Sequence, residues 1–173
     1  VMGSVPDSDQ TNGSQPVVDV GWHDCQEFCR RAGLVLPTEA RWEYAARGPE
    51  GLEYPWGRDF RASSCQSDAD MHGFPGTAPA GSFPSGASWC GALDMAGNVW
   101  EWCRDRYDEY YYSSALAGAV DPECVKAGQE ADGARVLRGG AWGNQPQHCR
   151  SAYRGWAQPS RRLDLGFRAS KNP

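Results

Sequence analysis

The sequence has 173 residues, a formal net charge of −5 and 40% hydrophobic residues, which fits a globular domain rather than a disordered chain. Its mean hydropathy is −0.66, and no apolar run approaches the roughly 18 residues that a membrane-spanning helix needs, so no membrane insertion by this chain is expected. The 21 glycines and 8 tryptophans are many for this length and favour a loop-rich fold held by large aromatic side chains. This composition argues against a helical bundle.

The charge is divided unevenly along the chain. Residues 133–173 carry eight Lys or Arg and one acid, a net charge of +7, whereas residues 1–132 carry −12. A basic tail can bind nucleic acid, but arginines that pair with the acids of an acidic body give the same pattern. Composition alone leaves both interpretations open.

The seven cysteines have no CxxC spacing. Cys25 and Cys29, with His23 nearby, resemble half of a metal site, but a structural zinc ion needs four ligands and no second close pair exists. An odd number leaves at least one thiol outside any disulfide. The compartment therefore stays open, with the cell surface, the extracellular space and the cytoplasm all compatible. The sequence begins at Val1 without a leader pattern, and we expect it to be a fragment.

The N-terminal part predicts one strand and one helix. Residues 1–15 are polar and rich in turn formers, so we expect a flexible N-terminal segment before a single domain at 16–173. The apolar residues of 16–20 predict a short strand. Apolar residues on one helical face predict a helix over about 22–31, with Phe28 on the buried side, that ends at the following glycine.

A second helix is predicted after Pro37. Thr38 has the side chain of an N-cap, and Glu39 places an acid in the first turn, where the helix dipole favours it. Trp42 and the alanines one turn further along form the predicted buried stripe. Gly48 ends the helix.

The remainder of the chain predicts long loops and short strands. Residues 49–98 and 113–134 show no sustained periodicity and contain many Gly, Pro, Ser and Asp. Strands are predicted at 98–107, at 135–142 with a break at its glycine pair, and at 166–169.

Seven phrases of the sequence form one ordered pattern. They are Pro16–Trp22 (PVVDVGW), Leu36–Gly48 (LPTEARWEYAARG), Tyr54–Gly57 (YPWG), Asp94–Cys103 (DMAGNVWEWC), Arg135–Trp142 (RVLRGGAW), Arg150–Arg154 (RSAYR) and Gly166–Arg168 (GFR). The pattern resembles the sulfatase-modifying factor family, the domain of formylglycine-generating enzyme, over about residues 16–170. The resemblance implies an α+β, C-type-lectin-like fold of the formylglycine-generating-enzyme type, with two N-terminal helices, short twisted antiparallel strands and long irregular loops. The part of the family domain that precedes PVVDV is missing or much shortened here.

The resemblance also provides a test for catalysis. Formylglycine-generating enzymes oxidise a substrate cysteine with copper held by two cysteines that follow the glycine pair at 139–140. Asn144 stands at the first of these positions, and the RSAYR phrase places Cys149 beyond the second. One cysteine cannot form a two-coordinate copper site, so we expect no copper and no catalytic residues. His148 beside Cys149 is a poor nucleophile pair, because adjacent strand residues point to opposite faces. Cys149 is instead expected to pack or to form a disulfide, with Cys103 as the preferred partner.

The family binds calcium around the GNxWEW phrase. Carried over to this sequence, Asp94 and Glu101 would provide carboxylates, and Gly97 and Val99 backbone carbonyls, for a structural calcium ion. The alternative is that the two acids only cap backbone amides or pair with arginines. A second family calcium site maps near His72, which stands where an acid is expected.

The segment 142–164 alternates family words with dissimilar residues. It resembles the variable region of diversity-generating retroelement proteins, which use the same domain and display rewritten side chains on a constant scaffold. Aromatic and adaptable polar side chains on a rigid framework are typical of a binding surface. Trp142 is expected in the core. The predicted ligand-binding residues are Gln145, Gln147, His148, Tyr153, Trp156, Ser160, Arg161, Leu163 and Asp164.

The sequence therefore predicts a non-catalytic ligand-binding domain with a diversified surface, whose partner is a protein or another macromolecule. The alternatives are an oxidase that acts on a protein cysteine and another non-catalytic structural or regulatory member of the family. Five tail arginines fall in family phrases and are expected to anchor the scaffold: Arg135, Arg138, Arg150, Arg154 and Arg168. Only Arg161, Arg162 and Lys171 remain free, too few for nucleic-acid binding.

Overall fold

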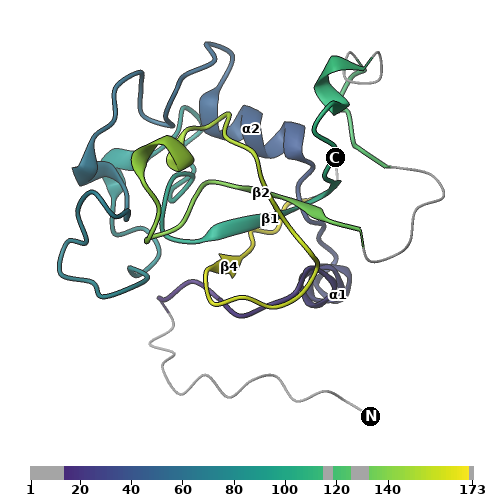
Figure 1. The fold of residues 1–173 in the computed structure, drawn as a ribbon, viewed down its shortest axis with the longest axis horizontal. Coiled ribbons are helices and arrows are strands. Elements are labelled where there is room, and N and C mark those ends of the chain that lie inside the picture. Colours follow the sequence, from purple (N-terminus) through teal and green to yellow (C-terminus); the bar gives the residue numbers. More distant parts are fainter. Residues whose placement is uncertain (1–13, 115–118, 126–132, 172–173) are drawn as a thin grey trace.

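The computed structural model describes residues 14–114, 119–125 and 133–171. The expected flexible segment 1–15 falls almost entirely outside these ranges. Figure 1 shows a curled sheet between two helices, with the irregular loops gathered at one end. Within the described ranges, no helix combines the length and the apolar character needed to cross a bilayer.

The first helix, α1, spans Trp22–Ala32 and confirms the prediction within one residue. The backbone N–H of the preceding glycine donates to the Asp24 carboxylate at 3.0 Å, and Gly33 ends the helix with a φ of 69°, a left-handed conformation that suits glycine. Phe28 was expected to be buried, but it is exposed and its ring lies edge-on against Phe167 at 5.5 Å. The prediction was wrong because Trp22, Cys25 and Cys29, rather than Phe28, form the buried face of α1.

The second helix, α2, spans Glu39–Arg47. The Thr38 hydroxyl accepts the N–H of the third helical residue at 3.2 Å, which confirms the predicted N-cap. Trp42 and Ala46 are buried on the face that packs against the sheet. Gly48 follows with a φ of 65°, and a Cβ there would lie 2.8 Å from the Trp89 ring.

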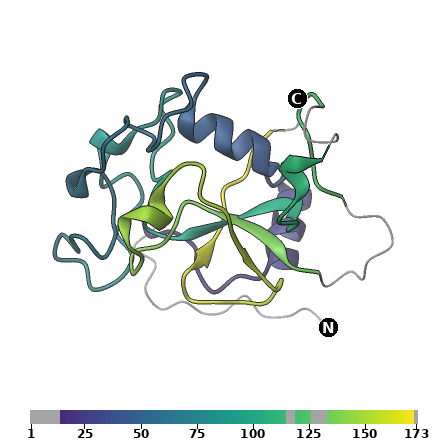
Figure 2. The same ribbon diagram turned by 45° about the horizontal axis from the view of Figure 1, so that its top comes forward.

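The four strands form one sheet in the order β3-β2-β1-β4. β1 (Trp100–Arg106) pairs with β2 (Arg135–Arg138), and β2 pairs with β3 (Gly155–Ala157), in both cases antiparallel. These two pairings confirm the expected antiparallel strands. β4 (Leu165–Gly166) pairs with β1 in parallel, so the sheet is mixed. The chain crosses from β3 over the sheet before it reaches β4 on the other edge, which gives the parallel direction (Figure 2).

Three predicted strands are absent, shortened or shifted. Residues 16–20 form no strand, because Asp19 takes a left-handed φ of 57° and its N–H donates to the Arg162 carbonyl at 3.1 Å. The strand expected over 135–142 ends at Arg138, since both following glycines have positive φ angles. The last strand ends at Gly166 rather than at 169.

The long irregular region 49–98 is organised by side chains rather than by a backbone ladder. Buried Gln66 donates its amide hydrogens toward three carbonyls of the loop 71–76, the nearest being that of Gly76 at 2.9 Å. Gly97 packs so closely here that a Cβ would lie 2.1 Å from the Gln66 carbonyl oxygen. A few buried polar residues therefore hold a loop that has no sheet or helix to pair with.

The buried apolar residues form three clusters. The first packs α1 against Trp102, the second packs α2 against Met95, and the third surrounds Cys65 and Cys149 with Tyr54. Cys103 belongs to the second cluster, so the preferred disulfide between it and Cys149 was wrong. Cys149 instead packs with Cys65 in the third cluster.

Candidate functional site

A cleft of 450 Å³ lies beside β3, where the segment 142–164 crosses the sheet. Four of the nine predicted ligand-binding residues line it: His148, Tyr153, Trp156 and Asp164. The structure does not bring the other five to this cleft. They are exposed on the surrounding surface: Gln145, Gln147, Ser160, Arg161 and Leu163.

Aromatic rings form the walls of the cleft. His148 and Tyr153 meet edge to face, with ring centroids 4.9 Å apart, and Trp100 lies 6.0 Å from Tyr153. Trp156 is 56% exposed, and its centroid lies 5.9 Å from that of Tyr107. Rings that support one another while remaining open to solvent provide rigid contact area for a ligand.

Trp100, Tyr107 and Asn144 are among the cleft residues that sequence reasoning missed. The first two come from β1 and from the residue that follows it, so only the sheet order brings them to this surface. Asn144 is fixed by its own turn, since its Oδ1 accepts the N–H of Ala141 at 2.9 Å. Trp142 was expected in the core but is only half-buried and belongs to none of the three clusters, because its backbone N–H is tied to Asn98 at the loop end of the sheet.

Two basic residues at the rim were expected to be free, and that expectation was wrong. Arg162 lies 3.3 Å from the Asp164 carboxylate, and Arg161 pairs with Asp24 of α1 at 3.0 Å. Both pairs are at least partly exposed, so they contribute little to stability. They instead leave fewer unpaired positive charges for a nucleic acid.

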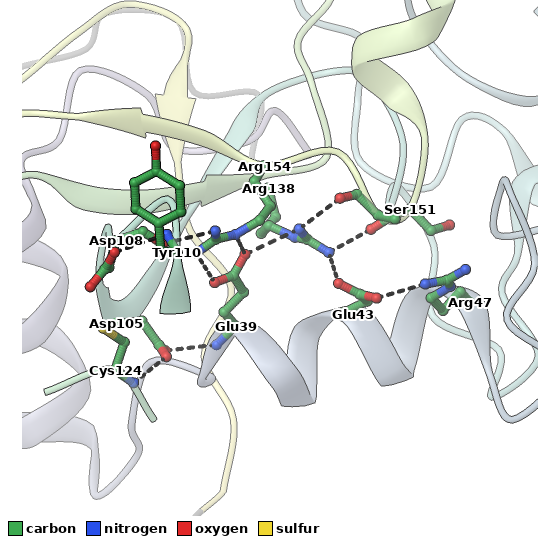
Figure 3. A network of polar contacts seen from close by, with 11 residues as sticks. Glu39, Glu43, Arg47, Asp105, Asp108, Tyr110, Cys124, Arg138, Ser151 and Arg154 are labelled. Carbon is green, nitrogen blue, oxygen red and sulfur yellow. Dashed lines mark hydrogen bonds and ion pairs between the residues drawn. The ribbon is translucent and has the colours of Figure 1, made fainter. Parts of the chain in front are cut away.

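A buried network of glutamates and arginines supports the segment from below (Figure 3). The side chains of Glu39 and Arg138 are both 0% exposed, and their closest N–O distance is 3.2 Å. Glu39 also accepts two hydrogen bonds from Arg154, at 2.7 and 2.9 Å. Glu43, one turn further along α2, accepts from Arg138 at 2.6 Å. Both glutamates project from α2 toward the segment, so the helix and the segment are fixed to each other.

The arginines of this network also hold the backbone of the segment. Arg138 donates to the carbonyls of Ser151 and Ala152, at 2.6 and 3.3 Å. Arg154 donates to the Asp108 carbonyl at 3.0 Å, and its guanidinium lies 5.0 Å from the ring of Tyr107. These contacts fix the path of residues 151–154 without involving the side chains at 152 and 153.

Asp105 secures the N-terminal end of α2. Its two carboxylate oxygens accept the backbone N–H groups of Glu39 and Cys124, at 2.7 and 2.9 Å. Burial raises the pKa of Asp105 to about 6, although both hydrogen bonds oppose the shift.

Three further tail arginines anchor the scaffold in different ways. Arg168 makes a bidentate contact with Glu101 at 2.6 and 2.7 Å, and Arg150 makes an exposed contact with Glu53. Arg135 donates to a backbone carbonyl, and its guanidinium stacks 3.5 Å from the centre of the Trp22 ring.

The residues predicted to bind calcium do not present a free set of oxygen ligands. Arg168 occupies both oxygens of Glu101, and the Trp42 indole N–H donates to one of them at 2.7 Å. Asp94 accepts a backbone N–H at 2.7 Å, Gly97 packs against a neighbouring carbonyl, and Val99 is buried. Across the described parts of the chain, no three His, Cys, Asp or Glu side chains are grouped to hold a metal ion. Glu101 does not fit a calcium ion in this arrangement, and the site remains a prediction.

The third cluster brings two thiols together, those of Cys65 and Cys149. Their contact lowers the pKa of Cys65, whereas the same contact and burial raise that of Cys149. Both side chains are almost fully buried and neither lines the cleft, in which Asn144 stands.

Comparison with known proteins fits this geometry. Residues 3–173 match the model of the sulfatase-modifying factor enzyme 1-like domain. The chain belongs to this family. It is 37% identical to a formylglycine-generating enzyme of Thermomonospora curvata over 92% of its own length and 56% of that enzyme's length, so it spans little more than half of this relative.

Two solved structures are similar in fold. PvdO from Pseudomonas aeruginosa superposes with a TM-score of 0.74 and 28% identity, over 90% of this chain and 61% of PvdO. Treponema denticola variable protein 1 superposes with a TM-score of 0.71 and 22% identity, over 98% of this chain and 76% of that protein, which shows the fold alone. The α+β, formylglycine-generating-enzyme-like C-type lectin fold is thus confirmed for this domain.

Proposed function

We propose that this domain is a non-catalytic ligand-binding module whose segment 142–164 displays a diversified surface to a protein or another macromolecule. The observation that carries the proposal is the separation of two sets of side chains in this segment. Cys149, Ser151 and Ala157 are buried, whereas His148, Tyr153 and Trp156 line an open cleft. A surface of this kind can change its residues while its backbone stays in place.

Two further observations support the absence of catalysis. The position of the first copper-binding cysteine of the family holds Asn144, and Cys149 is buried against Cys65 outside the cleft. The cleft therefore contains polar and aromatic groups suited to contact rather than a thiolate pair suited to Cu(I).

Tolerance to substitution tests the display surface directly. One library randomises the four cleft residues His148, Tyr153, Trp156 and Asp164, and a matched library randomises the four network residues Glu39, Glu43, Arg138 and Arg154. We expect most members of the first library to resist proteolysis and almost none of the second. Equal loss of folded members in both libraries would reject the proposal.

The encoding locus tests the diversified character. A near-copy of the codons for 141–168 that differs mainly at adenines, beside a gene for a reverse transcriptase, is the expected finding. A locus without either feature would leave an ordinary binding domain of the same family.

The alternative is an enzyme that oxidises a protein cysteine, which the name of the Thermomonospora relative favours. It predicts tight Cu(I) binding that is lost in Cys149→Ser, together with an aldehyde product from a cysteine-containing peptide in the presence of oxygen. Our proposal expects no aldehyde, and its detection would establish the alternative.

A further inference from the structure

A second pocket of 580 Å³ lies on the side of α2, away from the core. Four residues of α2, spaced like one helical face, form one wall: Ala40, Glu43, Tyr44 and Arg47. The opposite wall contains Tyr112, Ala152 and Arg154. Because Arg154 lines both this pocket and the cleft beside β3, the two cavities adjoin across one stretch of chain.

Exposed aromatic rings lie on both walls of this pocket, which we call the α2 pocket. Tyr44 is 54% exposed and Tyr112 is 41% exposed. Tyr44 is held in place by Trp89, whose ring lies edge-on at 5.1 Å and whose indole N–H donates to the Tyr44 carbonyl at 2.7 Å. Exposed but supported Tyr and Trp rings beside an arginine are the composition of interface hot spots.

Positive charge predominates in the network that borders the pocket. Three guanidiniums, those of Arg47, Arg138 and Arg154, share the carboxylates of only two glutamates. Asp105, the next acid, lies at the N-terminal end of α2, where it accepts backbone N–H groups and contacts none of these guanidiniums (Figure 3). Each guanidinium contacts a carboxylate, but three positive charges against two negative ones leave the network with a net positive charge.

Of the two network arginines that line the pocket, Arg47 is the one with unused hydrogen-bonding capacity. It donates to Glu43 at 2.8 Å, but its Nη2 reaches only the neutral carbonyl of Gly51, at 3.0 Å. Its Nε has no partner among the described residues. A carboxylate that replaced the Gly51 carbonyl would receive a charge-assisted bond from a guanidinium already oriented by Glu43.

We propose that the α2 pocket binds an acidic segment of a partner polypeptide, with a carboxylate on Arg47 and a neighbouring apolar side chain between Tyr44 and Tyr112. The pocket is distinct from the display surface, since none of the nine predicted ligand-binding residues lines it. The proposal therefore does not depend on whether segment 142–164 is diversified.

Two capped peptides test this site in the intact chain: acetyl-Gly-Phe-Asp-Gly-amide and the same peptide with Asn in place of Asp. We expect the Asp peptide to shift the amide resonances of α2 and Gly51 in a ¹H–¹⁵N titration, and the Asn peptide to bind about tenfold more weakly. Free phenylacetate is the third probe. Tighter binding of phenylacetate than of the Asp peptide would assign the pocket to a small carboxylate and overturn the polypeptide partner.

Matched variants identify the contact. Arg47→Gln is expected to lower the affinity for the Asp peptide to that of the Asn peptide, whereas Arg30→Gln, an exposed arginine of α1, leaves it unchanged. Trp156→Ala should also leave it unchanged, so failure here and failure of the display surface are distinguishable. Equal affinity for the two peptides, or shifts that avoid α2, would overturn the proposal even if Arg47→Gln failed to fold.

Discussion

The cleft beside β3 and the glutamate–arginine network below it use the same short segment in opposite ways. In the cleft, His148 and Tyr153 meet edge to face, and Trp156 lies exposed to solvent beside Tyr107. In the network, Arg138 and Arg154 are almost enclosed, and every bond they make is to a carboxylate or a carbonyl. The difference shows how a loop without long strands can have a fixed backbone and still carry surface side chains that are free to change.

The largest expected effect comes from breaking the network. Arg138→Leu leaves the buried Glu39 and the partly exposed Glu43 without their shared partner, and we expect a loss of about 3–5 kcal/mol in the free energy of unfolding. Urea denaturation measures it. The control is Arg150→Leu, which removes an exposed pair and should cost less than about 1 kcal/mol. Similar losses in both variants would contradict the contrast between the two regions.

The next effect concerns the thiols under the cleft. Glutathione disulfide, which takes up the two electrons, is expected to join Cys65 to Cys149 and to raise the free energy of unfolding by about 2–4 kcal/mol, because the bridge closes a long loop. Peptide mapping under non-reducing conditions identifies the bridge. Cys65→Ser should abolish it, whereas Cys103→Ser should not. A bridge between Cys103 and Cys149 would contradict this geometry.

Asp105 makes the stability of the α2 end depend on pH. Its pKa of about 6 in the folded protein exceeds the ordinary value of 3.8, so folding takes up a proton between these values. Its contribution to the free energy of unfolding is therefore largest below about pH 4 and decreases as the pH rises through 6, by up to about 3 kcal/mol. The difference between the wild type and Asp105→Asn, measured by urea denaturation from pH 4 to 7, should decrease accordingly. A constant difference would contradict the prediction.

The smallest effect is expected at the surface of the cleft. Replacing both Tyr153 and Trp156 by Ala should lower the free energy of unfolding by about 1 kcal/mol or less, because neither belongs to a core cluster. Thermal unfolding measures it. Trp102→Ala, which empties a fully buried site on β1, is the matched comparison and should cost about 3–5 kcal/mol.

Local signals predicted the parts of the fold that depend on neighbouring residues. Thr38 and Gly33 marked helix ends because capping involves only adjacent backbone groups. The family phrases placed the arginines of the scaffold, and Arg138, Arg154 and Arg168 do pair with acids of the N-terminal part.

Contacts between distant segments could not be predicted from such local signals. Nothing near Asp19 indicates that its N–H meets the Arg162 carbonyl, and nothing near Cys149 indicates Cys65. The same holds for the cleft, which Trp100 and Tyr107 line because the strand order places β1 beside β2. Pairing across the sheet, rather than local preference, determines these neighbours.

The two hydrogen bonds from Arg138 to backbone carbonyls bear on which residues of segment 142–164 can change. Every amino acid has a backbone carbonyl oxygen. The hydrogen bonds from Arg138 therefore depend on the position of the backbone and not on which side chains it carries. Codons at neighbouring positions can then drift or be rewritten with little penalty in folding. The side chains that face the cleft are therefore not the groups that fix the backbone at Ser151 and Ala152.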